Sequence, residues 1–431
     1  MNRTSTTVHA LMACGFLSWA VPASADAVTD WNEITVAAVA LGRPGPIGQM
    51  DIALVQIAVH DAVQAIDKRY EPYHAEIRGA HGRPSAAVAA AAHDVLVGIY
   101  PEQATSIDAT YFAYLASNGL TDNPGLAVGQ KVAASILPLR RVNPDPLPPP
   151  FVGGTNPGQW RPTPSFLGNP PLPPSESPML TPWMGEFDPF TLTSPRRFRA
   201  DPPPVLTSER YRRDYREVKA LGALVASKRT PEQTDVAYFW TDNFLAQSNR
   251  ALRAIAARHL NRTGDTARLL ALANMAMADA VITSWNSKRF YAFWRPVTAI
   301  QEGDNDGNPA TAGDRAWQPL INTPNYPDYT SGANNIIAAM SQTLALYFGT
   351  DRMTFQVTSL APLAVQKTRT YYRFSDLRKE VVNARIYLGI HFRFADVAAR
   401  DQGRRVAEWT FDHFLLPRDG GRHDYDDRSN D

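Results

Sequence analysis

The chain has 431 residues, more than a single compact core usually uses, so its length favours two packed units. Hydrophobic residues make up 44% of it, which is enough for a large core and excludes a disordered chain. Lys and Arg total 43 against 42 Asp and Glu, a formal net charge of +1. This balance argues against nucleic acid as a partner, since backbone-phosphate binding needs a basic surplus. Any anion site must concentrate charge locally.

Residues 1–25 have the features of a secretory signal. Arg3 gives a positive start, residues 10–21 form a modest apolar run, and small residues at 23–25 offer a cleavage site. The run is too short and too interrupted to span a membrane. We therefore expect an exported protein, periplasmic or secreted, with no membrane span.

The alternative for this segment is a buried N-terminal helix, which Gly15 and Pro22 would interrupt. Cys14, the single cysteine of the sequence, also lies here. Cleavage of the segment would leave no thiol, which excludes disulfides, thiolate metal sites and cysteine nucleophiles.

Residues 26–142 are predicted to form an N-terminal helical bundle. Apolar residues recur at helical spacing over 52–66, and the alanine-rich stretch 86–100 would let helices pack closely. Residues 143–206 differ sharply, because proline runs exclude continuous helix there. We expect an ordered, irregular wrap, since the segment carries aromatic residues worth burying: Trp160, Phe166, Trp183, Phe187, Phe190 and Phe198.

Helical patterning returns at residue 207 and predicts a C-terminal bundle over 207–417. Thr230, Pro231 and Gln233 form a capping-box start signal. No alternating strand pattern is found, so the predicted fold is all-α, with two helical bundles joined by the proline-rich segment. Residues 418–431 are predicted to be a charged, frayed tail. The further helical stretches predicted in this half are 266–295, 334–348 and 380–414.

Residues 285–296 contain the first candidate site motif. Lys288 and Arg295 are seven apart, so on a helix they would share a face about 10 Å apart along the axis. Pro296 biases Arg295 away from helical geometry and predicts a helix end there. An anion between the two cations would relieve their repulsion. The alternative is a surface charge pair over a packed aromatic stripe.

Residues 324–335 form the second candidate motif and lead into an apolar helix. Ser331 and Gly332 at the start of this helix could offer a hydroxyl and backbone N–H groups to an anion, where the helix dipole also favours negative charge. The alternative is a plain turn and helix cap.

Residues 383–394 form the third motif. Arg385 and His391 are six apart, which on a helix is about 9 Å along the axis and roughly 120° around it. A long arginine can cover that offset and meet the histidine at one ligand. The alternative is a histidine buried in an apolar helix as part of the core.

Taken in order, the three motifs resemble those of the vanadium-dependent haloperoxidases, particularly bacterial members. This family belongs to a superfamily with the type 2 phosphatidic acid phosphatases and acid phosphatases. The shared pattern is Lys-x6-Arg-Pro, then Ser-Gly-His, then Arg-x5-His, and the resemblance covers most of the chain after residue 25. The matching residues here are Lys288, Arg295, Pro296, Ser331, Gly332, Arg385 and His391.

The resemblance implies that Lys288, Arg295 and Arg385 neutralise the oxygens of a bound vanadate, or of phosphate in a phosphatase. Planar guanidinium groups suit oxyanions. Ser331 and the Gly332 N–H would donate hydrogen bonds to the same ligand.

His391 would, on the same resemblance, coordinate vanadium through a ring nitrogen or attack phosphorus in a phosphatase. Trp285 and Tyr326 would form pocket walls. Hydrogen peroxide, a halide and a small organic substrate would be the partners. The sequence leaves open the oligomeric state, the halide and the organic substrate.

Two positions depart from the family pattern. Ala333 stands where Ser-Gly-His has its acid/base histidine, a loss typically worth about 10²- to 10⁴-fold in rate. Phosphatase members often carry an aspartate four residues after the nucleophilic histidine, where this chain has Ala395, with Asp396 one position later. Asp242 is a further acidic residue whose relation to the pocket the sequence leaves open.

The leading interpretation is a vanadate-dependent haloperoxidase relative with halide oxidation weakened by Ala333. The second is an acid-phosphatase-type phosphomonoester hydrolase that uses His391 as nucleophile. The third is an oxyanion-binding protein without turnover.

Overall fold

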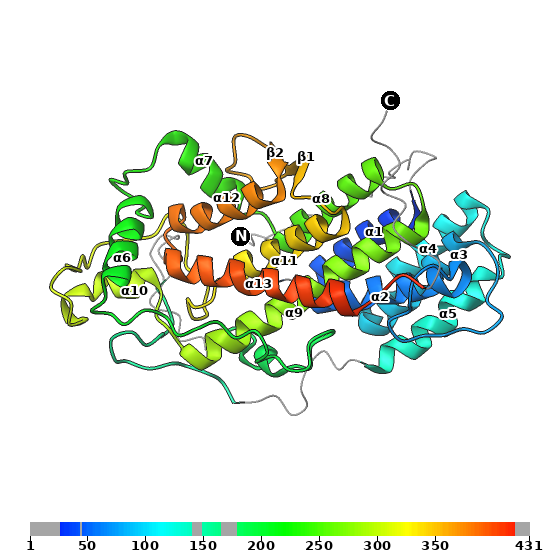
Figure 1. Cartoon of the computed structure of the whole chain (residues 1–431), viewed down its shortest axis with the longest axis horizontal. Helices are drawn as coiled ribbons and strands as arrows, with labels where there is room; N and C mark the ends of the chain where they lie inside the picture. Colours follow the sequence, from blue (N-terminus) through cyan, green and yellow to red (C-terminus); the bar gives the residue numbers. More distant parts are fainter. Residues whose placement is uncertain (1–25, 44, 140–148, 165–178, 419–431) are drawn as a thin grey trace, which may run out of the picture.

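A computed structural model describes residues 26–43, 45–139, 149–164 and 179–418. The predicted signal segment, Cys14, Phe166 and the tail beyond residue 418 lie outside these ranges. The described chain is mainly helical, as predicted, with an elongated shape (Figure 1). Its first five α-helices are α1 (Ala27–Gly42), α2 (Gly48–Asp67), α3 (Pro84–Ile99), α4 (Ala104–Asn118) and α5 (Gly125–Ile136).

Eight further α-helices follow the proline-rich segment. They are α6 (Glu209–Leu221), α7 (Pro231–Phe239), α8 (Phe244–His259), α9 (Thr263–Tyr291), α10 (Pro296–Gln301), α11 (Gly332–Tyr347), α12 (Phe374–Tyr387) and α13 (Arg393–His413). Short 3₁₀ turns are η1 (Pro101–Gln103), η2 (Leu137–Leu139), η3 (Pro182–Glu186) and η4 (Gly303–Asn305). The predicted capping box of Thr230 and Gln233 is present at the start of α7.

The long helix α9 is the centre of the molecule. It packs against α2 of the first bundle and against α11 and α13 of the second (Figure 1). By length and composition α9 could cross a membrane, but the most apolar part of it is entirely buried inside the protein, as in a core helix.

Alanine makes the first bundle compact. Residues 86–92 of α3 are fully buried, and Gly129 of α5 lies so close to α3 that a Cβ there would fall 2.3 Å from the Ala87 carbonyl oxygen. Small side chains therefore set the distance between these helices.

The described parts of the proline-rich segment are irregular and packed against the helices. Trp160 is fully buried, and its backbone N–H donates to the Ala292 carbonyl at 2.6 Å. Phe190 is buried beside α9, where Asp279 accepts its backbone N–H at 2.6 Å. Trp183, Phe187 and Phe198 are partly buried against the main core.

The prediction that no strand is present is wrong for one hairpin. Strands β1 (Arg352–Thr358) and β2 (Thr368–Arg373) pair antiparallel, with Phe355 opposite Tyr371. Each strand buries alternate residues. Both strands are short and rich in Thr and Arg, so few apolar side chains mark the alternation in the sequence.

Two helix boundaries also differ from the prediction. Helix α9 ends at Tyr291, where Ala292 has φ 45°, so Lys288 and Arg295 do not share one helix. The predicted helix 380–414 is two helices, α12 and α13, with Gly389 at φ 78° between them. Glycine adopts that backbone conformation without a steric penalty, and the chain turns there.

Candidate active site

His391 lies in the link between α12 and α13, so its predicted helical spacing from Arg385 is wrong. The link turns the side chain inward, where it is 1% exposed. Its Nδ1 lies 2.7 Å from Asp328 Oδ1, and both residues are buried. Because a guanidinium group can only donate, the ring nitrogen Nε2, which lies 3.0 Å from Arg295 Nη1, is an acceptor.

Arg295 lies directly beside His391. It is the extended N-cap residue of α10, which frees its side chain from helical geometry as Pro296 predicts. Its Nη1 is 3.0 Å from His391 Nε2 and donates to the Ile390 carbonyl at 2.6 Å, and its Nε donates to the Tyr326 carbonyl at 2.8 Å.

Lys288 enters the same region from the last turn of α9. Its Nζ donates to the carbonyls of Pro327 at 2.6 Å and Asp328 at 3.2 Å, and it lies 4.8 Å from the Tyr326 ring centre. The loop before Ser331 thus holds both Lys288 and Arg295 through carbonyl oxygens.

Arg385, in the last turn of α12, has the fewest internal partners of the three cations. Its Nη1 makes one long hydrogen bond of 3.5 Å to the Trp240 carbonyl, and its buried Nε has no partner within the described residues. Its guanidinium carbon lies 5.4 Å from the Phe244 ring centre.

The pKa shifts indicate that these groups share one electrostatic environment. Burial lowers the pKa of His391 well below its usual value, and the charges of Arg295, Lys288 and Arg385 lower it further. Burial and then the Arg295 charge also lower the pKa of Lys288 well below its usual range. Burial and mutual repulsion thus disfavour the positive charge of these basic groups, a cost that a bound anion would relieve.

The two carboxyl groups of this region do not cancel that positive charge. Burial raises the pKa of Asp328 to about 7, although Arg295 and Lys288 oppose the shift. Burial raises the pKa of Asp396 well above its usual value, which favours the protonated form of this carboxyl. A site with three basic side chains and two carboxyl groups, whose charged forms burial disfavours, favours the binding of anions.

Ser331 and Gly332 stand at the N-terminus of α11, as predicted. Ser331 is the N-cap residue and is fully buried. The Asn334 amide donates to Ser331 Oγ at 3.3 Å and to Asp396 Oδ1 at 2.8 Å. Asp396 therefore supports the Ser331 side of the site, while the carboxylate beside His391 is Asp328.

A cavity of about 250 Å³ opens next to these groups. Ala333 lies in its wall, so the position of the absent acid/base histidine faces the cavity. His391, Lys288, Arg295 and Ser331 are buried next to this wall, with Tyr326 contacting both Lys288 and Arg295. The lining residues are Gly45, Pro46, Asp242, Asn243, Phe244, Leu245, Trp285, Tyr326, Gly332, Ala333, Ile336 and Arg385.

Two acidic residues, Asp242 and Asp328, lie in or beside this site. Asp242 lies at the cavity wall, with its carboxylate accepting from the Leu360 N–H at 2.8 Å and from Arg250 at 3.2 Å. Asp328 is the site residue that sequence reasoning missed. Its position three residues before Ser331, inside a candidate motif, was the available signal.

Comparisons with known proteins identify what the chain is similar to. A family model described as the VCPO second helical-bundle domain matches residues 268–420, which include all three motifs. The vanadium chloroperoxidase of Curvularia inaequalis is 29% identical over 287 residues, which cover 51% of this chain and 46% of that protein. The match thus spans about half of that relative's length.

Solved structures show the same fold over nearly the whole chain. The first bacterial vanadium-dependent iodoperoxidase superposes with a TM-score of 0.75 at 22% identity, covering 92% of this chain and 98% of its own. A holo-type bacterial vanadium-dependent chloroperoxidase superposes with a TM-score of 0.69 at 16% identity. The superposition covers 86% of this chain and 93% of that one. Residues 268–420 thus match the VCPO second helical-bundle domain, and the fold of the chain is similar to that of the vanadium-dependent haloperoxidases.

Proposed function

We propose that this protein binds vanadate and uses hydrogen peroxide to oxidise a halide, which then halogenates a small organic substrate. The observation that carries the proposal is the burial of Lys288, Arg295 and Arg385 beside His391 with too little negative charge to balance them. The similarity of the chain to vanadium-dependent haloperoxidases favours vanadate among the oxyanions that would fit.

The donor set fits such a group. In the part of the chain that the structure describes, the buried Nε of Arg385 has no hydrogen-bond partner. Two guanidinium groups and one ammonium group match the negatively charged oxygens of vanadate. Ser331 and the Gly332 N–H, at a helix N-terminus, would donate hydrogen bonds to it.

His391 would hold vanadium through Nε2, with Asp328 fixing the ring from the other side. Bound vanadate would supply the Lewis acidity that activates hydrogen peroxide. The chain itself would neutralise charge, orient the ligand and limit the access of water. Ala333 leaves the proton-handling position without a titratable group, so we expect slow turnover relative to oxyanion binding.

Two assays test the proposal. Protein supplied with orthovanadate should brominate a phenol-red-type dye in the presence of peroxide and bromide, and added phosphate should abolish this activity by competition. His391→Ala should remove both activity and vanadate binding measured by equilibrium dialysis. His81→Ala, at an exposed histidine far along the chain, is the matched control and should change neither.

The same assays separate the other two interpretations. Vanadate-free release of phosphate from an aryl phosphate, lost in His391→Ala, would replace the peroxidase proposal with a phosphatase. Tight oxyanion binding with neither reaction would identify a binding protein, in which Ala333 marks lost turnover.

A further inference from the structure

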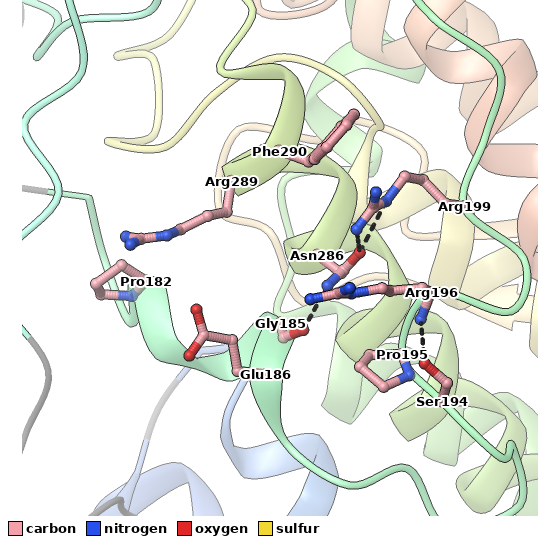
Figure 2. Close-up of a pocket in the computed structure, with 10 residues that line it drawn as sticks. All are labelled: Pro182, Gly185, Glu186, Ser194, Pro195, Arg196, Arg199, Asn286, Arg289 and Phe290. Atoms are coloured by element: carbon pink, nitrogen blue, oxygen red, sulfur yellow. Dashed lines mark hydrogen bonds between the residues drawn. The ribbon is translucent and has the colours of Figure 1, made fainter.

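A second and larger pocket, of about 460 Å³, lies at the C-terminal end of α9 (Figure 2). Helix α9 forms one side, η3 another, and the irregular stretch 194–199 a third. Figure 2 shows Arg289, Arg196 and Glu186 extending from these three elements around the pocket. The lining residues are Pro182, Gly185, Glu186, Ser194, Pro195, Arg196, Arg199, Asn286, Arg289 and Phe290.

Three arginines surround this pocket, Arg196, Arg199 and Arg289. None of them has a carboxylate within ion-pair distance in the part of the chain that the structure describes. Other arginines do have one: Arg393, for example, lies 2.7 Å from the Glu217 carboxylate. Glu186 is the one carboxylate among the lining residues, so in a chain of net charge +1 this pocket has a local excess of positive charge.

The guanidinium group of Arg199 is held in place by contacts within the protein. Its Nε and Nη2 donate to Asn286 Oδ1 at 3.0 and 2.6 Å, and its guanidinium carbon lies 3.9 Å from the Phe290 ring centre. Asn286 is itself buried and oriented, since its Nδ2 donates to the Gly185 carbonyl at 2.8 Å. Two fixed contacts reduce the entropy that Arg199 would lose on binding an anion.

The arginines disfavour one another in the absence of a ligand. Burial lowers the pKa of Arg199, and the charge of Arg196 lowers it further. A negative group between them would relieve this repulsion.

The pocket is distinct from the candidate active site. Asn286, Arg289 and Phe290 line it, whereas Trp285 lines the active-site cavity and Lys288 contacts the loop that holds Arg295. The two sites therefore use different faces of the same helix end.

We propose that this second pocket binds a small organic monocarboxylate with an apolar ring. The carboxylate would lie among the three guanidinium groups, and the ring would cover Phe290, which is 61% exposed. Glu186 on the pocket wall disfavours a second negative group, which selects a monoanion over a polyanion. The inference does not depend on the proposed haloperoxidase activity.

Isothermal titration with 1-naphthoate tests the proposal. The double variant Arg196→Ala/Arg289→Ala should weaken binding about tenfold or more, because two charge-assisted contacts are lost. Both side chains are exposed, so the fold should be unaffected. Arg315→Ala, at an exposed arginine outside the pocket, should leave binding unchanged.

A gain-of-binding variant guards against misfolding as an explanation. Glu186→Gln should strengthen naphthoate binding by removing a like charge, and the neutral 1-naphthamide should bind weakly to every variant. His391→Ala should retain naphthoate binding. Unchanged affinity in the double variant, equal binding of the amide, or loss of binding in His391→Ala would each overturn the proposal.

Discussion

Arg385 carries a buried charge that the surrounding protein does little to compensate. Within the described residues it makes one 3.5 Å hydrogen bond and its Nε has no partner, and burial lowers its pKa. Such a charge destabilises the ligand-free fold and is retained where a ligand needs it. Stability and oxyanion affinity should therefore respond in opposite directions when it is removed.

Arg385→Met is expected to raise the free energy of unfolding of the ligand-free protein by about 1 to 3 kcal/mol, because an uncompensated charge is replaced by an apolar chain of similar length. The same change should weaken vanadate or phosphate binding about tenfold to a hundredfold. Urea unfolding and equilibrium dialysis measure the two effects. A fall in both quantities would indicate a purely structural arginine.

Ala333 gives a second prediction at this scale. Its position in the wall of a 250 Å³ cavity leaves room for an imidazole. Ala333→His should raise the turnover of vanadate-loaded protein by up to about 10²-fold, since a positioned acid/base is worth that much or more. Vanadate affinity should change little. An increase in neither peroxidase nor phosphatase activity would contradict the assignment of this position.

At the scale of single elements, the sequence predicted helices better than their ends. The capping box at Thr230 was read correctly because every group in it is local. The helix end at Ala292 and the turn at Gly389 were missed, since tertiary contacts select those backbone conformations. The β1–β2 hairpin was missed because few apolar side chains mark its alternation.

The wrapping segment supplies the element-scale prediction. Asp279 of α9 accepts the backbone N–H groups of Phe190, Thr191 and Leu192 and the Thr191 hydroxyl, at 2.6 to 3.2 Å. Asp279→Ala should lower the free energy of unfolding by about 3 to 5 kcal/mol, because it leaves buried donors unpaired.

Chemical denaturation measures this loss. Asp122→Ala, at an exposed aspartate, is the control and should stay within about 0.5 kcal/mol of the wild type. A similarly small effect of Asp279→Ala would show that the segment is held mainly by its buried aromatics.

For the whole molecule, the sequence predicted the two-bundle helical fold and the residues that converge on one site. The sequence did not predict how these residues converge. Lys288, Arg295 and His391 meet at the loop 324–328, and backbone carbonyls of this loop accept hydrogen bonds from Lys288 and Arg295. Asp328 completes that contact. Spacing along a helix carries no information about such a loop, because it depends on contacts between distant segments.

The pH dependence of global stability should reflect two buried groups of α2 with opposite effects. Burial raises the pKa of Asp51 from 3.8 to about 6 and lowers that of His60 from 6.5 to about 4. Between about pH 4 and 6 the folded protein keeps a proton on Asp51 that the unfolded chain has released, so stability falls as the pH rises. For His60 the unfolded chain binds the proton, so stability falls as the pH drops.

Each pKa shift changes the free energy of unfolding by about 3 kcal/mol across its pH range. In the wild type the two pH dependences have opposite signs and largely offset each other. As the pH rises from 4 to 7, the free energy of unfolding of Asp51→Asn should increase by about 3 kcal/mol relative to that of the wild type. As the pH falls toward 4, the free energy of unfolding of His60→Gln should increase by a similar amount relative to the wild type. Urea unfolding at several pH values checks both. If the free energy of unfolding varied with pH in the same way for the two variants and the wild type, these groups would have the same pKa in the folded and unfolded states. Opposite slopes would show that α2 limits the pH sensitivity of the whole fold by burying an acid and a base on one helix.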